Sequence, residues 1–261
     1  RHGHVVVPRP REAPPAGIRV RGATERLVRR LDLGDAAALA ALVREELGPV
    51  LLGQDARQVQ RLWSLMYNGP RAGHAVARGR AMPVLGRRGL HLCAMSGVDL
   101  ALWDLLGKSL GQPVSALLGG ACRDRVRAYA SGGWADEREI GEELTGYLRK
   151  GFTAVKMRMG AMDGSVVTSV ARVRAARSAI GADVELMADA HGTMSVADAK
   201  RFCAEAADAG LRWLEEPVGA DDRAGAAEVR RMSTIPIAAG ESETTCFEFL
   251  ELLRSGAVDV L

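Results

Sequence analysis

The sequence predicts an α/β fold, a (β/α) TIM-like barrel in which parallel strands are covered by helices. From Val126 onward, short apolar runs alternate with helical patterns, which is typical of a parallel sheet with helices packed on it. The starts of these runs lie 22–31 residues apart, about the length that a strand, a crossover helix and the next strand need. Three of the runs end in an acidic residue. Since a barrel places its site at the carboxyl ends of its strands, these residues also favour a barrel.

The expected elements of this region follow from the apolar runs and the patterns between them. Strands are expected at residues 126–130, 153–157, 184–188, 211–214, 235–239 and 257–261. Helices are expected at Ile140–Lys150, Val166–Ile180, Val196–Ala209, Ala226–Met232 and Cys246–Arg254. A doubly wound Rossmann sheet is the alternative, but no G-x-G-x-x-G opens the first unit.

The N-terminal part reads as mainly helical. Val5–Val7 is the one apolar run before residue 20 and predicts a short edge strand. Helices are expected at Asp35–Leu47, ended by Gly48-Pro49, at Asp55–Tyr67 and at Leu92–Leu110. Residues 71–90 carry several Arg and Gly without periodicity, so we expect a loop there.

The three acidic residues at strand ends are Asp189, Glu215 and Glu241, and they follow one another at intervals of 26 residues. Acidic residues after strands are often helix N-caps or turn formers, but an even spacing over three successive units is hard to explain in that way. Three carboxylates on neighbouring parallel strands suit a hard divalent cation such as Mg²⁺. We therefore predict that Asp189, Glu215 and Glu241 are metal ligands.

Two nearby acidic residues are assigned other roles. Glu216 follows a predicted ligand and would point away from it in a pleated strand, so a supporting role is expected. Glu243 is expected to cap the following helix. The four tryptophans read as packing residues.

From about Leu51 to Leu261, the sequence resembles the enolase superfamily, mandelate racemase subgroup. The resemblance rests on Asp189, Glu215 and Glu241 and on four further segments. Those segments are Ser96–Asp104, Pro113–Gly120, Val126–Ala130 and Lys156-Met157-Arg158. It implies an N-terminal α+β capping domain over residues 1–120, whose sheet is poorly represented here, and a barrel domain over residues 121–261.

The resemblance also implies candidate catalytic residues. Lys156 and Arg158 share one face of a strand, at the place of a family Lys-x-Lys in which the first Lys neutralises the substrate carboxylate and the second is the general base. Arginine is a poor base because it stays protonated, so Arg158 is expected to bind substrate. His191 lies two residues after Asp189, where members that dehydrate sugar acids carry the His that protonates the leaving hydroxyl. An imidazole suits proton delivery near neutral pH, whereas a lone His is usually structural.

The resemblance thus implies a Mg²⁺-dependent dehydratase of a sugar acid, forming a 2-keto-3-deoxy acid after loss of the proton α to the carboxylate. A racemase, epimerase or cycloisomerase on the same scaffold is the alternative, and His191 separates the two, because racemisation needs no acid at a leaving group. A non-catalytic barrel-fold protein is a third reading. The sequence ends inside the sixth expected strand, and the resemblance implies that the family's base lies on later strands, so the base is not named here unless Lys156 serves. We expect the functional chain to extend beyond Leu261 or the remaining strands to be disordered.

The amino-acid composition limits the classes of protein to which this chain can belong. The chain has 261 residues, 48% of them hydrophobic, and a net charge of +3, which is ordinary for a globular protein and too small to imply a nucleic-acid partner. We find no stretch of about 18 apolar residues and no signal peptide, and the four cysteines are scattered. A cytoplasmic, reduced enzyme without a membrane partner is expected, and we expect a homo-oligomer.

Overall fold

In the computed structural model, residues 36–76 and 87–261 are described. The chain divides into two compact units, with the boundary between Asp124 and Arg125. The prediction of a capping domain over residues 1–120 and a barrel domain over 121–261 stays a prediction. The strand expected at Val5–Val7 lies outside the described residues.

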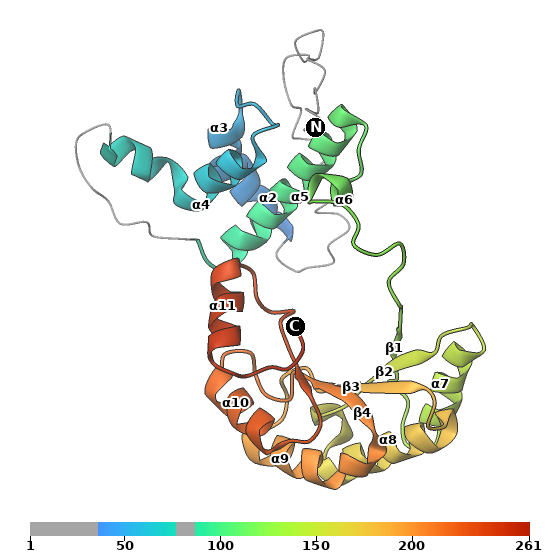
Figure 1. The fold of residues 1–261 in the computed structure, drawn as a ribbon. Coiled ribbons are helices and arrows are strands. Elements are labelled where there is room, and N and C mark those ends of the chain that lie inside the picture. The colour runs from blue at the N-terminus through green and yellow to red at the C-terminus, as the bar shows by residue number, and fades with distance from the viewer. Residues whose placement is uncertain (1–35, 77–86) are drawn as a thin grey trace, which may run out of the picture. The chain divides into compact units, whose positions relative to one another are not determined.

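The described part of the first unit is helical (Figure 1). Its elements are α2 (Ala36–Ala41), the π-helix η1 (Leu42–Leu47), α3 (Gly48–Leu51), α4 (Val59–Val76), α5 (Leu90–Leu110) and α6 (Val114–Leu117). These helices enclose a core that includes Leu47, Leu62, Met66 and Met95, each at most 1% exposed.

Two predicted boundaries in this unit are wrong. Gly48-Pro49 does not end the first helix, which runs on through α3 to Leu51. The π-helix η1 ends at Leu47, two residues before Pro49, so the backbone bond that proline cannot donate falls where the helix is already distorted. Helix α4 begins at Val59, later than the expected Asp55, and non-helical backbone at Gly69 (φ 66°) divides it into two helices. The first therefore ends close to the expected Tyr67, and the second runs on to Val76. Residues 71–76 are therefore not a loop.

Helix α5 is long and apolar enough to cross a membrane by length and composition, the one such helix in the part of the chain that the structure describes. The sequence predicts no apolar stretch of that length, so helix α5 differs from the expectation. Leu92, Met95 and Leu102 of this helix are buried in the helical core, and core helices of folded domains pass the same criterion. One helix of this kind is weak evidence for a membrane span.

The second unit is a five-stranded parallel sheet in the order β1-β2-β3-β4-β5, with helices packed against it (Figure 1). The strands are β1 (Ala130–Gly132), β2 (Ala154–Arg158), β3 (Glu185–Asp189), β4 (Leu211–Glu215) and β5 (Ile237–Ala238). The helices are α7 (Ile140–Leu148), η2 (Ala161–Asp163), α8 (Val166–Ile180), α9 (Val196–Glu205), η3 (Ala207–Ala209), α10 (Arg223–Met232) and α11 (Cys246–Arg254).

The predicted α/β barrel-type fold is confirmed, because strand order follows chain order throughout this sheet. A doubly wound sheet would reverse direction at a switch point. The first strand lies later than expected, at Ala130–Gly132 rather than 126–130. The sixth run contributes a single bridge, Val260 to Ala238.

Alternation along the strands separates an apolar face from a polar one. Val155, Met157, Leu186 and Leu214 belong to the core under the helices, together with Phe202 of α9, and all five are buried. Since successive side chains point to opposite faces, the intervening residues of the same strands face away from this helical layer. This second face carries the predicted site residues.

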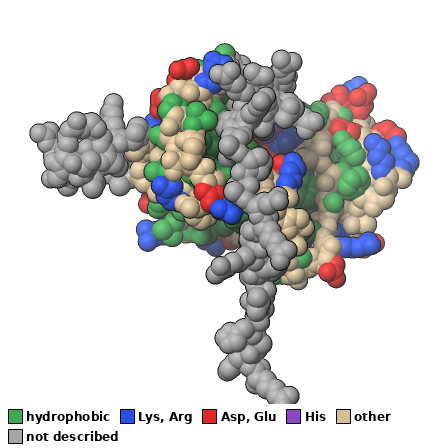
Figure 2. Space-filling view, turned by 90° about the horizontal axis from the view of Figure 1, so that it is seen from above, with side chains coloured by type: hydrophobic (Ala, Val, Ile, Leu, Met, Phe, Trp, Pro, Cys, Tyr) green, Lys and Arg blue, Asp and Glu red, His purple; other side chains and the backbone are tan. Residues whose placement is uncertain are grey.

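On the face of the molecule in Figure 2, the described Lys and Arg side chains lie among Asp and Glu side chains. Such mixing differs from the clustered basic stripe of a nucleic-acid-binding face.

Candidate functional site

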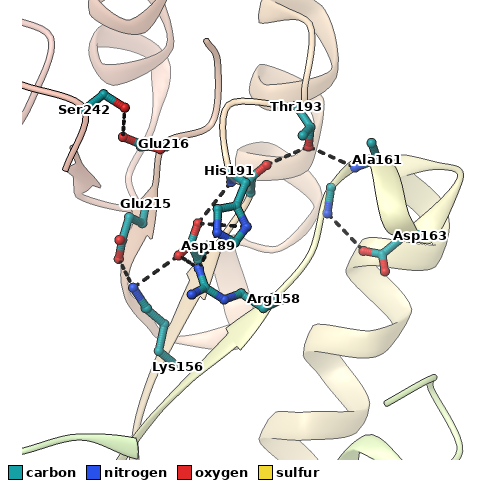
Figure 3. A network of polar contacts seen from close by, with 12 residues as sticks. Lys156, Arg158, Ala161, Asp163, Asp189, His191, Thr193, Glu215, Glu216 and Ser242 are labelled. Carbon is teal, nitrogen blue, oxygen red and sulfur yellow. Dashed lines mark hydrogen bonds and ion pairs between the residues drawn. The ribbon is translucent and has the colours of Figure 1, made fainter. Parts of the chain in front are cut away.

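Charged side chains from three adjacent strands share the sheet face opposite the helices (Figure 3). Arg158 on β2 is the register partner of Asp189 on β3, and Asp189 is the partner of Glu215 on β4. Lys156 lies two residues before Arg158 and therefore on the same face. All four side chains lie at or near the carboxyl ends of their strands.

Lys156 joins two of the predicted ligands. Its Nζ lies 2.6 Å from Oε2 of Glu215 and 3.2 Å from Oδ2 of Asp189. The side chains of Lys156, Asp189 and Glu215 are only 6%, 1% and 15% exposed, and buried charges need such partners. Burial alone would lower the pKa of Lys156, but the hydrogen bond and charge of Glu215, followed by the charge of Asp189, raise it. Lys156 is therefore a buried cation between two carboxylates.

Arg158 and His191 complete the surroundings of Asp189. Arg158 Nη1 contacts Oδ2 of Asp189 and lies 2.9 Å from Nε2 of His191. The His191 backbone N–H donates to Oδ1 of Asp189 at 3.0 Å. His191 has a positive φ of 49°, a conformation that non-glycine residues rarely adopt and that clusters at functional sites.

Glu216 turns away from Glu215 and toward Ser242 (Figure 3), as expected, and its Oε1 accepts from the Ser242 hydroxyl at 3.4 Å. It is the other described non-glycine residue with positive φ, at 41°. Burial raises the pKa of Glu216, and the charges of Glu241, Asp189 and Glu215 raise it further. The three predicted ligands therefore lie close enough to Glu216 for their charges to raise its pKa.

Glu241 lies on the segment after β5, and its side chain is exposed. Within residues 36–76 and 87–261, no group of three or more His, Cys, Asp or Glu side chains is arranged to hold a metal ion. Asp189 and Glu215 converge on Lys156 instead. The assignment of Asp189, Glu215 and Glu241 as ligands therefore stays a prediction.

The donor chemistry at this position nevertheless suits a hard cation. Asp189, Glu215 and Glu241 carry carboxylate oxygens, the ligands that Mg²⁺ prefers. The raised pKa of Glu216 reflects both its burial and the negative charge around it, and a bound cation would offset that charge. The chemistry of these carboxylates therefore fits a bound Mg²⁺ ion.

Two residues differ from the roles expected of them. Glu243 does not cap α11: its Oε2 accepts from Arg223 Nη2 at 2.9 Å, and the cap is Thr245, in a reciprocal capping box with Glu248. Trp134 is not a packing residue, because it is 59% exposed. Its ring lies 6.3 Å from that of His191 and 5.7 Å from Cζ of Arg158. The sequence did carry a signal for this exposed position, because Trp134 directly follows Gly132-Gly133 at the end of the first strand.

Comparison with sequence families gives two matches that together span most of the chain. The model described as "Enolase C-terminal domain-like" matches residues 139–261. The model described as "Mandelate racemase / muconate lactonizing enzyme, N-terminal domain" matches residues 21–119.

Individual relatives agree with these matches. The chain is 37% identical over 234 residues to a D-galactarolactone cycloisomerase of Agrobacterium fabrum, and the match covers 88% of this chain and 58% of that protein. It is 38% identical over 237 residues to a D-galactonate dehydratase of Verminephrobacter eiseniae, with 87% and 58% covered. The chain thus spans less than two thirds of the length of these curated relatives.

A solved structure shows the same fold. An enolase from Bradyrhizobium, complexed with magnesium and mandelic acid, is 34% identical and superposes with a TM-score of 0.73. The match covers 87% of this chain and 59% of that one.

Proposed function

Because the chain belongs to the mandelate racemase / muconate lactonizing enzyme family of enolase-like proteins, we propose that it acts as a Mg²⁺-dependent dehydratase of a sugar acid. The observation that carries this proposal is the convergence of Lys156, Arg158 and His191 on Asp189 at the carboxyl edge of the sheet. A dehydratase needs cations for the substrate carboxylate and an acid for the leaving hydroxyl, and these three side chains provide both.

Asp189, Glu215 and Glu241 would hold Mg²⁺, whose charge would stabilise the negative charge that develops on the substrate carboxylate. The magnesium in the Bradyrhizobium structure supports a metal site, and the dehydratase of Verminephrobacter eiseniae supports the reaction. Lys156 and Arg158 would orient the substrate carboxylate by charge-assisted hydrogen bonds. Arg158 does not take the α-proton, because a guanidinium stays protonated.

His191 would act on the hydroxyl β to the carboxylate. A general base first takes the α-proton as the α C–H bond breaks, and the electron pair of that bond moves into the carboxylate to form an enediolate. That pair then forms a double bond between the α- and β-carbons as the β C–O bond breaks, and the hydroxyl takes a proton from His191 and leaves as water. The resulting enol tautomerises to the 2-keto-3-deoxy acid.

The test compares two reactions of one variant, with D-galactonate and Mg²⁺ as the probe. His191→Asn should abolish keto-acid formation yet retain exchange of the α-proton with D₂O, because proton abstraction precedes loss of the hydroxyl. His91→Asn, the same substitution at a residue that pairs with Glu46, is the matched control and should retain both. Dehydration by His191→Asn at the wild-type rate would contradict the acid role, and loss of both reactions would make His191 the base.

Cycloisomerisation is the second candidate, favoured by the 37% identity to the D-galactarolactone cycloisomerase. That reaction opens or rearranges a ring without net loss of water. Mass analysis of the product distinguishes the two candidates, because a dehydrated product is lighter than its substrate by one water and an isomer has the same mass.

A further inference from the structure

Trp134 stands beside the candidate site on the segment that follows β1. Although 59% exposed, its ring lies within 6.3 Å of the His191 ring at an interplanar angle of 26°. Cζ of Arg158 lies 5.7 Å from its centroid, within the range of a cation–π contact. An exposed indole is thus placed next to Arg158 and His191, two of the side chains that the proposed dehydration uses.

The backbone on both sides of Trp134 is held by one side chain from α7. The N–H groups of Gly133 and Ala135 donate to the two carboxylate oxygens of Glu143, at 2.7 and 2.9 Å. A single carboxylate therefore fixes the amides that flank Trp134.

A second charged side chain, from α8, holds the carbonyls of the same two residues. Arg172 Nη2 donates to the carbonyl oxygens of Gly133, at 3.0 Å, and Ala135, at 2.6 Å. Arg172 is 2% exposed and pairs with Asp163 at 2.5 Å. Since burying a guanidinium is costly unless its donors are satisfied, these backbone bonds are part of what makes the buried position of Arg172 tolerable.

The same network includes Arg158. Arg172 Nη1 donates to the Arg158 carbonyl at 2.9 Å, and the Arg158 N–H donates to the Gly133 carbonyl at 3.2 Å. Gly133 has φ +72°, and a Cβ there would lie 2.5 Å from Cβ of Met157, so only glycine fits. These contacts therefore fix the backbone at Trp134 relative to the backbone of Arg158.

Taken together, Glu143 and Arg172 bind four backbone groups around a residue whose own side chain is mostly exposed. A turn that served only packing would bury its aromatic ring, because burial of an indole is favourable. We propose that Trp134 is a wall of the substrate site, whose ring face packs against the carbon chain of the sugar acid. Glu143 and Arg172 are positioning residues that act through Trp134. This inference rests on the proposed function.

The chemistry of the ligand fits this surface. The face of an aromatic ring carries partial negative charge, and the C–H groups of a polyhydroxylated chain are polarised in the opposite sense. An acid with several carbons beyond the carboxylate can reach the ring, whereas a two-carbon hydroxy acid cannot cover it. Trp134 would therefore select for chain length and leave recognition of the carboxylate to Lys156 and Arg158.

Calorimetric titration in the presence of Mg²⁺ with two acids, D-galactonate and glycolate, tests the wall. Trp134→Ala should weaken D-galactonate binding about tenfold and leave glycolate binding unchanged, since the loss of a stacked contact is of that size. Trp134→Phe should restore most of the difference. An equal loss for both acids, or no loss for either, overturns the inference. If the wild-type protein binds neither acid, the proposed function itself fails and the inference with it.

A second arm tests the positioning residues through hydrogen exchange of the Gly133 and Ala135 amides. Glu143→Gln leaves one acceptor oxygen for two donors, so these amides should exchange faster, and D-galactonate affinity should fall as in Trp134→Ala. The double variant should show no further loss. Glu142→Gln, at the neighbouring glutamate whose side chain is 76% exposed, is the matched control and should change neither property. Faster exchange in Glu143→Gln with unaltered preference between the two acids would mean that the network is structural only.

Discussion

Arg158 Nη1 and Nε2 of His191 lie 2.9 Å apart, although 33 residues separate them in the sequence. A guanidinium only donates hydrogen bonds, so Nε2 is the acceptor in this contact. The neutral imidazole then carries its proton on Nδ1, which lies 3.9 Å from Oδ1 of Asp189. Arg158 therefore sets the tautomer of the proposed acid as well as contacting Asp189.

This contact predicts opposite tautomers for two histidines. His91 Nε2 lies 3.2 Å from a carboxylate oxygen of Glu46, and an ionised carboxylate only accepts, so the His91 proton should sit on Nε2. ¹⁵N NMR of labelled histidine at about pH 9, well above the ordinary imidazole pKa of ~6.5, should show His191 protonated on Nδ1 and His91 on Nε2. Arg158→Met should shift the balance at His191 alone. A wild-type His191 protonated on Nε2 would contradict the donor assignment.

Substitution of the predicted ligands should weaken Mg²⁺ binding. Asp189→Asn and Glu215→Gln each remove an anionic oxygen donor, so we expect the affinity in calorimetric titration to fall at least about tenfold, the lower end of what even supporting residues contribute. Glu205→Gln, at a carboxylate that pairs with Arg201 on α9, should have no effect. Full Mg²⁺ affinity in both ligand variants would remove these residues from the metal site.

The buried pair of Arg172 and Asp163 should contribute strongly to stability. Their side chains are 3% and 1% exposed, and removing one charge leaves the other uncompensated, so Asp163→Asn should lower the free energy of unfolding in urea by about 3–5 kcal/mol. Asp208→Asn breaks the exposed pair with Arg174, whose side chains are 71% and 55% exposed, and should cost less than about 1 kcal/mol. Equal effects of the two substitutions would argue against a dominant buried pair.

The four thiols should differ in reactivity. Cys93, Cys122 and Cys246 are exposed and Cys203 is buried, and burial raises the pKa of Cys203. Because the thiolate is the reactive form, a thiol reagent at about pH 8 should label the three exposed cysteines rapidly and Cys203 only in denaturant. Rapid labelling of all four in the native protein would contradict the burial of Cys203.

The raised pKa of Cys203 also predicts how the free energy of unfolding changes with pH. The folded pKa of Cys203 lies above the unfolded value of ~8.5, so the folded state holds its proton where the unfolded state releases it. This contribution to stability is fully present below about pH 8.5 and is lost as the pH rises through the folded pKa. Cys203→Ala should remove that alkaline dependence from the unfolding free energy, whereas Cys246→Ala should leave it.

Helix α8 shows why much of the second unit could be predicted from sequence. Its observed bounds, Val166–Ile180, match those expected, because Ser165 is an N-cap whose hydroxyl accepts from the Thr168 N–H. Strand β3 is similarly clear, since four of its five residues are buried on the two faces of a covered sheet. Local signals of this kind depend on neighbours in the sequence.

The missed features depend on contacts between distant residues. Periodicity placed Lys156, Asp189 and Glu215 on one face, yet it could not show that the Lys156 ammonium lies between the two carboxylates. Trp134 was missed because its exposure follows from a turn held by Glu143 and Arg172, eight or more residues away. The metal ligands, the homo-oligomer and the cytoplasmic location stay predictions.

Chain-order pairing in the sheet has a consequence for how this unit folds. Register partners on neighbouring strands lie between 23 and 31 residues apart along the chain, so every pairing closes a short loop and none waits for a distant segment. During synthesis the sheet can therefore grow by one strand and one helix at a time. In that order the Lys156 ammonium would meet Asp189 when β3 pairs with β2, and Glu215 when β4 follows.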